Sequence, residues 1–216
     1  MVNLIVVAKE PRPGRVKTRL CPPCTFEEAA GLAKASLEDT LGAVSATSGA
    51  RHFLAIHGTT KGLVVPPSVV VLPQRRSGLA ERLASAFEDV GAPALLIGMD
   101  TPQITPGALL DALALFCSTD GAVLGPARDG GYWAIGLKET SDAVFHGIPM
   151  STERTYSVQR ERLLELGWSV AALPPLTDVD DIASAFEVAD AAPETSFAQH
   201  LAAVAARWAM AVRVDA

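Results

Sequence analysis

The sequence predicts a three-layer α/β/α fold around a mainly parallel sheet. Short apolar runs, most of them bounded by glycine or proline, have the composition of strands that are buried on both faces. Amphipathic segments alternate with these runs, as crossover helices do between parallel strands. The chain has 216 residues, 49% of them hydrophobic. That is enough for one full core, so we expect residues 1–216 to form a single domain.

The expected strands are short and follow one another along the whole chain. They cover Val2–Val7, Phe53–Ile56, Val69–Leu72, Ala94–Gly98, Ala122–Leu124, Tyr132–Leu137 and Val170–Leu173.

Helices are expected in the segments between these strands. Thr25 and Glu28 have the spacing of a capping box, and apolar residues recur at helical spacing behind them. Thr105 followed by Pro106 is typical of a second helix start. Further helical patterns lie at 79–90 and at 196–212, where a terminal helix is expected to pack on the outside.

The net charge of −6 argues against a general surface for nucleic acid or anionic membranes. No apolar stretch is long enough to span a membrane, and the N-terminus has no pattern of a secretory leader. Three cysteines fit a reducing compartment. We therefore expect a cytoplasmic protein with no nucleic-acid partner; the sequence leaves the oligomeric state open.

Cys21 and Cys24 form a CPPC motif with three interpretations: a redox pair, half of a zinc site, or an incidental pair in a loop. No second CxxC and no histidine pair at zinc-finger spacing completes a metal site, which favours the incidental pair. Cys117 follows apolar helix residues and is expected in the core.

The segment AKEPRPGRVKTRL, residues 8–20, concentrates positive charge between the first strand and the first helix. Gly14 allows the backbone to turn, and Lys17 and Arg19 can then face one anion. A solvated basic loop is the alternative, but the loop position and the acidic background favour an anion site. The spacing matches neither a P-loop nor a dinucleotide fingerprint.

Acidic residues follow two other expected strands. Asp100 comes directly after an apolar strand, where it either caps a turn or holds a cation. Asp178, Asp180 and Asp181 precede a helical pattern. One of them is expected to be an N-cap, but three carboxylates exceed what a cap needs and repel one another unless positive charge is near.

The segment LGPARDGGYWAIGL, residues 124–137, is rich in glycine and carries charged and aromatic side chains. The DGG within it is either a hairpin turn or part of a substrate-binding loop. All of these loops follow strands, and ligands of open α/β sheets bind at the carboxyl ends of strands. A basic loop, acidic points and a glycine-rich loop suit a polyphosphate, a divalent cation such as Mg²⁺, and a second substrate.

These segments resemble a known family. LIVVAKEPRPGRVKTRL, GMDTP, GPARDGGYWAIGL and LPPLTDVDD are similar to a bacterial family of small GT-A-fold proteins in the nucleotide-diphospho-sugar transferase superfamily, whose members are generally labelled glycosyltransferases by inference. The resemblance extends to about Phe186. KTRL also resembles the loop of 2-phospho-lactate guanylyltransferases, and the basic loop more distantly resembles sugar-1-phosphate and molybdenum-cofactor nucleotidyltransferases.

The resemblance implies roles for particular residues. It places a nucleotide on Ala8, Lys9, Gly14, Arg15, Lys17, Arg19, Gln74 and Gly78, and an acceptor on Asp129, Gly130, Gly131 and Tyr132. It implies catalytic roles for Lys17, Arg19 and Asp100, and Mg²⁺ or Mn²⁺ on Asp100 and Asp180. The residues after Asp180 depart from the family pattern, so Asp178 and Asp181 remain alternatives for the second ligand.

The implied activity is Mg²⁺-dependent transfer of a nucleotidyl group from a nucleoside triphosphate to a small phosphorylated or hydroxyl acceptor. Two alternatives stay open. One is a glycosyltransferase that uses a nucleotide-diphospho sugar, and the other is a nucleotide-binding protein without turnover.

Overall fold

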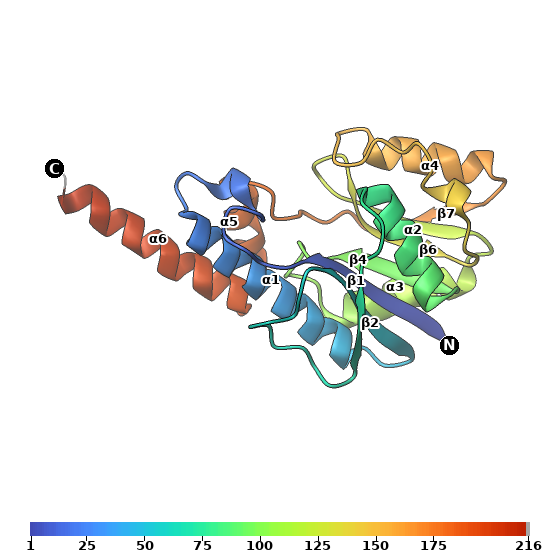
Figure 1. Cartoon of the computed structure of the whole chain (residues 1–216), viewed down its shortest axis with the longest axis horizontal. Coiled ribbons are helices and arrows are strands. Elements are labelled where there is room, and N and C mark those ends of the chain that lie inside the picture. Colours follow the sequence, from blue (N-terminus) through green and yellow to red (C-terminus); the bar gives the residue numbers. More distant parts are fainter. Residues whose placement is uncertain (215–216) are drawn as a thin grey trace.

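A computed structural model of the chain describes residues 1–214, with side chains described for residues 1–208 (Figure 1). The strands are β1 (Val2–Lys9), β2 (Ala50–His57), β3 (Val69–Pro73), β4 (Ala94–Gly98), β5 (Ala122–Pro126), β6 (Tyr132–Leu137) and β7 (Val170–Ala172). The helices are α1 (Phe26–Ala46), α2 (Leu79–Val90), α3 (Pro106–Ser118), α4 (Thr155–Glu165), α5 (Ile182–Ala191) and α6 (Ser196–Val214), with short 3₁₀ turns η1 (Thr18–Leu20) and η2 (Asp142–Val144).

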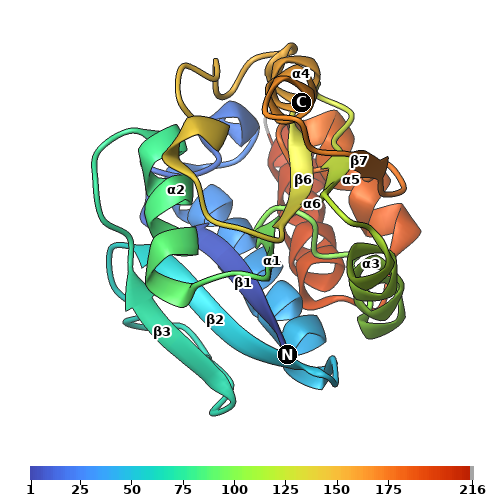
Figure 2. The same ribbon diagram turned by 90° about the vertical axis from the view of Figure 1, so that its right-hand side faces the viewer.

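The strands form one sheet in the order β3-β2-β1-β4-β6-β5-β7 (Figure 2). All neighbouring pairs are parallel except those of β6, which runs antiparallel to β4 and β5. The mainly parallel sheet is therefore confirmed, and every expected strand is present. The antiparallel β6 follows from the short DGG turn, because a parallel connection would need a crossover segment.

Helices cover both faces of the sheet and make three layers. Leu4 and Val6 of β1 pack with residues of α1 and α3 on one face. Ile5, which points the other way, packs with residues of α2 and α4. This alternation explains why the strands are apolar throughout: both faces are buried.

The capping box at Thr25 and the cap at Thr105 are both confirmed. The expectation for Cys117 is wrong, because its side chain is exposed near the end of α3. Phe116 takes the buried position there. The next residue along a helix points about 100° away from the buried stripe, which leaves the thiol facing solvent.

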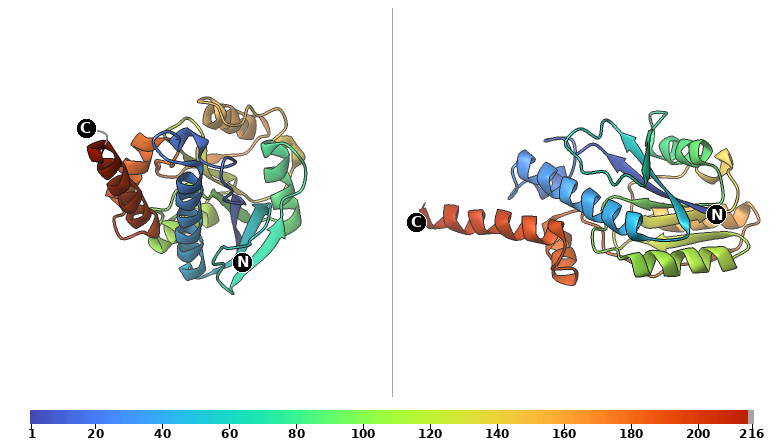
Figure 3. Two further views of the ribbon diagram at one scale, coloured as in Figure 1. Left: turned by 60° about the vertical axis from the view of Figure 1, so that its left-hand side comes forward. Right: turned by 90° about the horizontal axis from the view of Figure 1, so that it is seen from below.

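The terminal helix α6 packs outside the three layers, against α1 and α5, and its far end extends away from the sheet (Figure 3). Asp39 of α1 accepts hydrogen bonds from the backbone N–H groups of Ser196 (3.1 Å) and Phe197 (2.8 Å) at the start of α6. Phe197 and Leu201 are buried beside α1. None of the helices in the described part of the chain is both long and apolar enough to cross a membrane.

Asp39→Ala is expected to lower the free energy of unfolding by about 1 kcal/mol, because two N–H groups at the start of α6 lose their acceptor. For a chain of this size that corresponds to a fall in Tm of about 2–4 °C in calorimetry. Asp111→Ala, at an exposed position of α3, is the matched control and should leave Tm unchanged. Equal Tm values for both variants would show that Asp39 does not hold α6.

Candidate functional site

The loops singled out by the sequence meet at one edge of the sheet. The parallel strands β1 to β5 and β7 all end there, and the antiparallel β6 begins there. The basic loop leaves β1 at this edge, and Asp100 follows β4. Because β1 and β4 are hydrogen-bonded neighbours, these two segments start side by side.

The basic loop turns inward at Lys17. Gly14 has φ of +70°, which glycine adopts without strain, and Lys17 has φ of 48° in the left-handed region. The Lys17 side chain is only 11% exposed, and its Nζ lies 2.7 Å from Asp100 Oδ1. The same ammonium donates to the Val179 carbonyl oxygen. Lys17 therefore connects the basic loop to Asp100 and to the segment before α5.

The Asp100 carboxylate has no other partner among the described residues. Oδ1 is buried and accepts no hydrogen bond, so its 2.7 Å contact with Lys17 Nζ is an ion pair without hydrogen-bond geometry. No backbone N–H of the described chain donates to this carboxylate, so it does not cap its own turn. The Asp100 main chain is held separately, because its carbonyl oxygen accepts from Val179 N–H at 2.9 Å.

The other cations of the loop face outward. Arg19 Nη1 lies 2.5 Å from Asp180 Oδ2, and the Arg19 side chain is 69% exposed. Lys9 Nζ donates to the Arg15 carbonyl oxygen at 2.7 Å, which holds the start of the loop against its middle. Arg12 pairs with Glu10 at 2.8 Å.

The late acidic residues have three different environments. Asp181 is the N-cap of α5, and its Oδ1 accepts from Ser184 N–H at 2.8 Å. Asp180 pairs with Arg19. Asp178 faces the interior of the cleft, where burial and the neighbouring carboxylates of Asp129 and Asp100 raise its pKa to about 6. The predicted cap is thus Asp181, while the carboxylates of Asp178 and Asp180 make no such cap.

The glycine-rich segment is a hairpin between β5 and β6, as one of the two interpretations predicted. Asp129 Oδ1 accepts from Gly131 N–H at 2.7 Å within the turn. Gly130 has φ of +87°, and a Cβ there would lie 2.2 Å from the Glu153 carbonyl oxygen. Gly130 is therefore required for backbone packing. The Tyr132 hydroxyl is buried, which raises its pKa.

Two cavities meet at Lys9, Met99 and Asp100, which line both of them. The first, here called the basic lobe, has a volume of about 280 Å³. Its other lining residues are Arg15, Val16, Lys17, Thr18, Arg19, Ala33 and Asp180. Asp100 and Asp180, the two residues implied as metal ligands, thus line one cavity.

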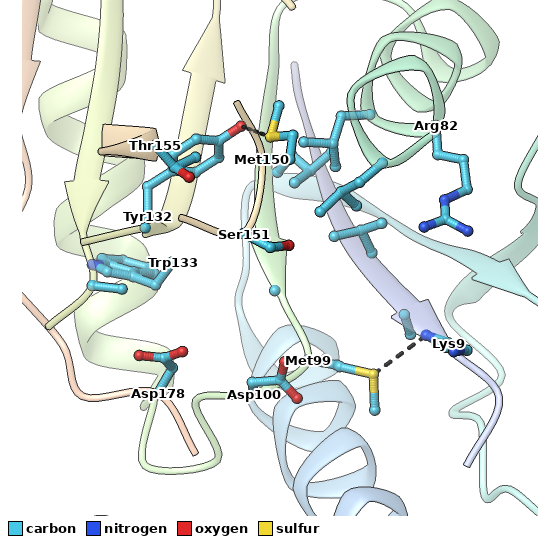
Figure 4. Close-up of a pocket in the computed structure, with 18 of the residues that line it drawn as sticks. Lys9, Arg82, Met99, Asp100, Tyr132, Trp133, Met150, Ser151, Thr155 and Asp178 are labelled. Atoms are coloured by element: carbon cyan, nitrogen blue, oxygen red, sulfur yellow. Dashed lines mark hydrogen bonds between the residues drawn. The ribbon is translucent and has the colours of Figure 1, made fainter. Parts of the chain in front are cut away.

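The second cavity, here called the apolar lobe, has a volume of about 350 Å³. Side chains of Leu79, Leu83, Leu96, Trp133 and Met150 form much of its wall. Figure 4 shows Asp100 and Asp178 together at one side of this lobe, with Arg82 of α2 well apart from them on the other. The apolar lobe therefore has an acidic side and a basic side.

Most residues implied by the resemblance line these lobes. Ala8, Gln74, Asp129, Gly131 and Tyr132 line the apolar lobe, Arg15, Lys17 and Arg19 line the basic lobe, and Lys9 and Asp100 line both. Three other implied residues, Gly14, Gly78 and Gly130, lie outside both lobes. Gly14 and Gly130 have positive φ angles and so determine the backbone path of their loops.

Gln74 is held rigidly by the sheet. Its Nε2 donates to the carbonyl oxygens of Ala8 and Ala55, both at 2.8 Å. Because both neighbours are acceptors, the amide orientation is determined and only the side-chain oxygen remains for a ligand.

Sequence analysis missed Arg82, Met150 and Ser151. Arg82 lies one position before Leu83 in an amphipathic helix, where a basic residue beside an apolar stripe was the available signal. Met150 and Ser151 lie in a loop whose sequence has no distinguishing pattern, although Ser151 has φ of 59° and lines the apolar lobe.

No group of three or more histidine, cysteine or carboxylate side chains in the described part of the chain is close enough to hold a metal ion. At any one point of the described cleft, only one or two carboxylates are therefore close enough to bind the same ion. This suits a cation that takes its remaining ligands from a substrate and water.

The chain belongs to the DUF2064 family, described as an uncharacterized protein conserved in bacteria, whose model matches residues 40–152. A 2-phospho-L-lactate guanylyltransferase of Methanocorpusculum labreanum is 27% identical over 179 residues, which are 82% of this chain and 79% of that protein.

Solved structures share the fold. A presumed nucleotide-diphospho-sugar transferase of Desulfovibrio desulfuricans G20 superposes with a TM-score of 0.82 at 25% identity, covering 95% of this chain and 96% of the other. The 4-diphosphocytidyl-2C-methyl-D-erythritol synthase of Anaerococcus prevotii has a TM-score of 0.54 at 9% identity, covering 88% and 94%. The expected family and fold are confirmed by these matches.

The CPPC motif lies outside both lobes, between η1 and α1, and its thiols are free. Burial raises the pKa of Cys24 to about 11, and burial together with Glu28 and Glu27 raises that of Cys21. A thiolate is the reactive form, so both groups are poor nucleophiles and poor metal ligands near neutral pH. This favours the incidental pair.

Alkylation with iodoacetamide at pH 7.5 is expected to modify exposed Cys117 first and Cys24 last, because so little of the Cys24 thiol is ionised well below its pKa of about 11. Mass spectrometry of peptides at timed intervals measures the order, with Cys117→Ser as the control that removes the fast phase. Rapid labelling of Cys21 or Cys24 in the folded protein would point instead to a reactive pair.

Proposed function

We propose that the chain is a Mg²⁺-dependent nucleotidyltransferase that moves a nucleotidyl group from a nucleoside triphosphate to a small phosphorylated or hydroxyl acceptor. The observation that carries this proposal is the Lys17–Asp100 ion pair at the point where the basic and apolar lobes meet. It puts phosphate-binding cations and a carboxylate beside one another, between two cavities that suit two substrates.

The expectation of a transferase enzyme is confirmed, since the relatives named above are transferases. The guanylyltransferase relative supports nucleotidyl transfer in particular. A single sheet joined to all the loops of the cleft supports one catalytic domain over residues 1–216. Three free thiols among the described residues suit the reducing cytoplasm as its location.

The site has the chemistry that a divalent cation requires. Asp100 Oδ1 is buried without a hydrogen bond, and Asp178 and Asp129 add negative charge nearby. A buried carboxylate oxygen in this position is stabilised by a cation. We propose Asp100 and Asp180 as the ligands, with Asp178 as the alternative partner; the use of Asp181 as the cap of α5 argues against Asp181 in this role.

The proposed reaction is an in-line displacement at the α-phosphorus. An oxygen of the acceptor forms a bond to the α-phosphorus, the bond from that phosphorus to the bridging oxygen of the β-phosphate breaks, and pyrophosphate leaves with the electron pair. An anionic phosphate oxygen attacks without losing a proton, whereas a hydroxyl acceptor would release its proton to water. Bound Mg²⁺ would supply charge neutralisation and alignment of the phosphate oxygens. Arg15, Lys17 and Arg19 would bind the triphosphate and stabilise the charge on the leaving group.

Before a nucleotide binds, Lys17 neutralises Asp100. If Asp100 held a metal, the ammonium would be free to bind phosphate oxygens while Val179 kept it in place. The ion pair would thus keep both groups charged and positioned until the nucleotide binds.

A glycosyltransferase using a nucleotide-diphospho sugar is the second candidate, favoured by the similarity to the Desulfovibrio structure. The four cations that line the basic lobe, Lys9, Arg15, Lys17 and Arg19, favour a triphosphate, which carries more charge than a diphospho sugar. Release of pyrophosphate from a nucleoside triphosphate supports the first candidate, and release of a nucleoside diphosphate from a nucleotide sugar supports the second. Nucleotide binding without any product would support the third alternative, a protein without turnover.

Lys17→Ala and Arg19→Ala are each expected to weaken binding of a Mg²⁺–nucleoside triphosphate about tenfold or more, because each removes a charge-assisted phosphate contact. Isothermal titration measures the affinities. Lys61→Ala, in an exposed loop outside both lobes, removes the same charge and should bind like the parent. If all three variants bind equally well, the basic loop is only a solvated segment.

Asp100→Asn is expected to fold normally and to lose the Mg²⁺-dependent part of nucleotide binding, since it keeps the shape but removes the charge that holds the metal. Thermal shifts with and without Mg²⁺ and nucleotide measure this, with Asp111→Asn as the surface control. Asp180→Asn and Asp178→Asn, compared in the same way, identify the second ligand. If nucleotide binding by Asp100→Asn still depends fully on Mg²⁺, then Asp100 does not hold the metal.

A further inference from the structure

Arg82 is a positive charge that the proposed chemistry does not use. It lies in the second turn of α2 and lines the apolar lobe (Figure 4). Its Nε is buried and has no hydrogen-bond acceptor among the residues that the structure describes. No carboxylate in that part of the chain lies within ion-pairing distance of its guanidinium. The residue as a whole is half-buried, but a buried N–H group of a cation that has neither an acceptor nor a counter-ion is unfavourable.

The surroundings of Arg82 suggest that the missing counter-ion is part of a ligand. The carboxylates of Asp100 and Asp178 lie on the side of the lobe away from Arg82 (Figure 4). The carboxylate of Asp129, which also lines the lobe, is close enough to Asp178 to raise its pKa. Lys9, the other permanently charged cation of the lobe, directs its Nζ to the Arg15 carbonyl oxygen in the basic loop. Apolar walls formed by Leu79 and Leu83 lie beside Arg82. An anion that enters the apolar lobe is therefore attracted to the guanidinium of Arg82.

The nucleotide does not account for that anion. In the proposed function its phosphates bind the basic lobe, on the other side of Asp100, where Arg15, Lys17 and Arg19 already provide three charges. The rest of the nucleotide, which the resemblance places on Ala8 and Gln74 in the apolar lobe, is an uncharged base and ribose and offers Arg82 no negative charge. The anion at Arg82 then belongs to the acceptor, at the end away from the reacting group.

The charge of the site identifies the kind of anion. One guanidinium balances one negative charge, and its planar pair of N–H groups matches the two oxygens of a carboxylate. A second phosphate group would bring about two charges and would be expected to need more than one cation.

We propose, on the basis of the proposed function, that Arg82 binds a carboxylate of the acceptor, and that the acceptor is a small phosphorylated carboxylic acid. Its phosphate lies at the Asp100 end of the lobe, where it attacks the nucleotide, and its carboxylate lies at the Arg82 end. Arg82 is then the residue that selects the acceptor. The name of the guanylyltransferase relative, which contains 2-phospho-L-lactate, is consistent with an acceptor of this chemistry.

The test compares two ligands that differ only in the carboxylate. 2-Phospho-L-lactate and isopropyl phosphate share the phosphate ester, and a methyl group replaces the carboxylate in the second. Isothermal titration of the full chain with each ligand, in Mg²⁺, is done for the parent, Arg82→Gln and Arg160→Gln. Arg160 is exposed on α4 outside both lobes, so its variant is the matched control for the loss of one charge.

The parent and Arg160→Gln are expected to prefer 2-phospho-L-lactate by about tenfold or more, and Arg82→Gln is expected to bind both ligands equally. Arg82→Lys should keep part of the preference. Because Arg82→Gln removes a buried N–H donor that has no acceptor, its Tm without ligand should not fall below that of the parent, which separates lost binding from lost folding.

Three results would overturn the proposal. The first is an unchanged ligand preference in Arg82→Gln. The second is a parent protein that binds 2-phospho-L-lactate, phosphoglycolate and 3-phospho-D-glycerate no better than phosphates without a carboxylate. The third is a loss of nucleotide affinity in Arg82→Gln. The last result would assign the anion to the nucleotide. Titration with Mg²⁺ and the α,β-methylene analogue of GTP is a separate arm, so failure of the parent to bind nucleotide would count against the proposed function alone.

Discussion

The contact between Lys17 and Asp100 joins the parts of the cleft. Asp100 follows β4, Lys17 lies in the loop after β1, and Val179 precedes α5; these segments are distant in sequence. The Lys17 ammonium pairs with the Asp100 carboxylate at 2.7 Å and donates to the Val179 carbonyl oxygen, while Val179 N–H donates to the Asp100 carbonyl oxygen. These three contacts join Lys17, Asp100 and Val179 pairwise at the end of a central strand, and each depends on the position of the others.

This arrangement also explains how an acidic protein keeps a basic loop in a defined shape. An isolated group of cations would repel one another and remain extended in solvent. Here Lys17 and Arg19 each have a carboxylate partner, and Lys9 is bonded to the loop backbone. The loop is held by the same acidic residues that the proposed function assigns to a metal, so the charges of Lys17 and Arg19 are balanced by these carboxylates.

The two lobes differ in a way that suits two substrates. The basic lobe is lined by cations from one loop, whereas the apolar lobe is built from β1, β4, β6, α2 and the segment before α4. Asp100 lies between them, so groups bound in the two lobes meet at its carboxylate. The unpartnered Arg82 gives the apolar lobe a second polar end, and a ligand that spans it needs complementary charge at both ends.

The sequence by itself determined the layers, the strands and the chemical character of the loops. Apolar runs buried on both faces are typical of strands covered by helices on each side. Thr25, Thr105 and Gly14 act through local backbone geometry that neighbouring residues decide. Tertiary structure decided which polar groups meet. The hydrogen bonds of Ser184 make Asp181 the cap of α5, whereas Asp178 faces the cleft. The orientation of α2 about its axis places Arg82 in the apolar lobe, and that of α3 leaves Cys117 facing solvent. Local spacing does not predict where Asp178 and Arg82 lie, because the other residues that line the apolar lobe come from segments far away in the chain.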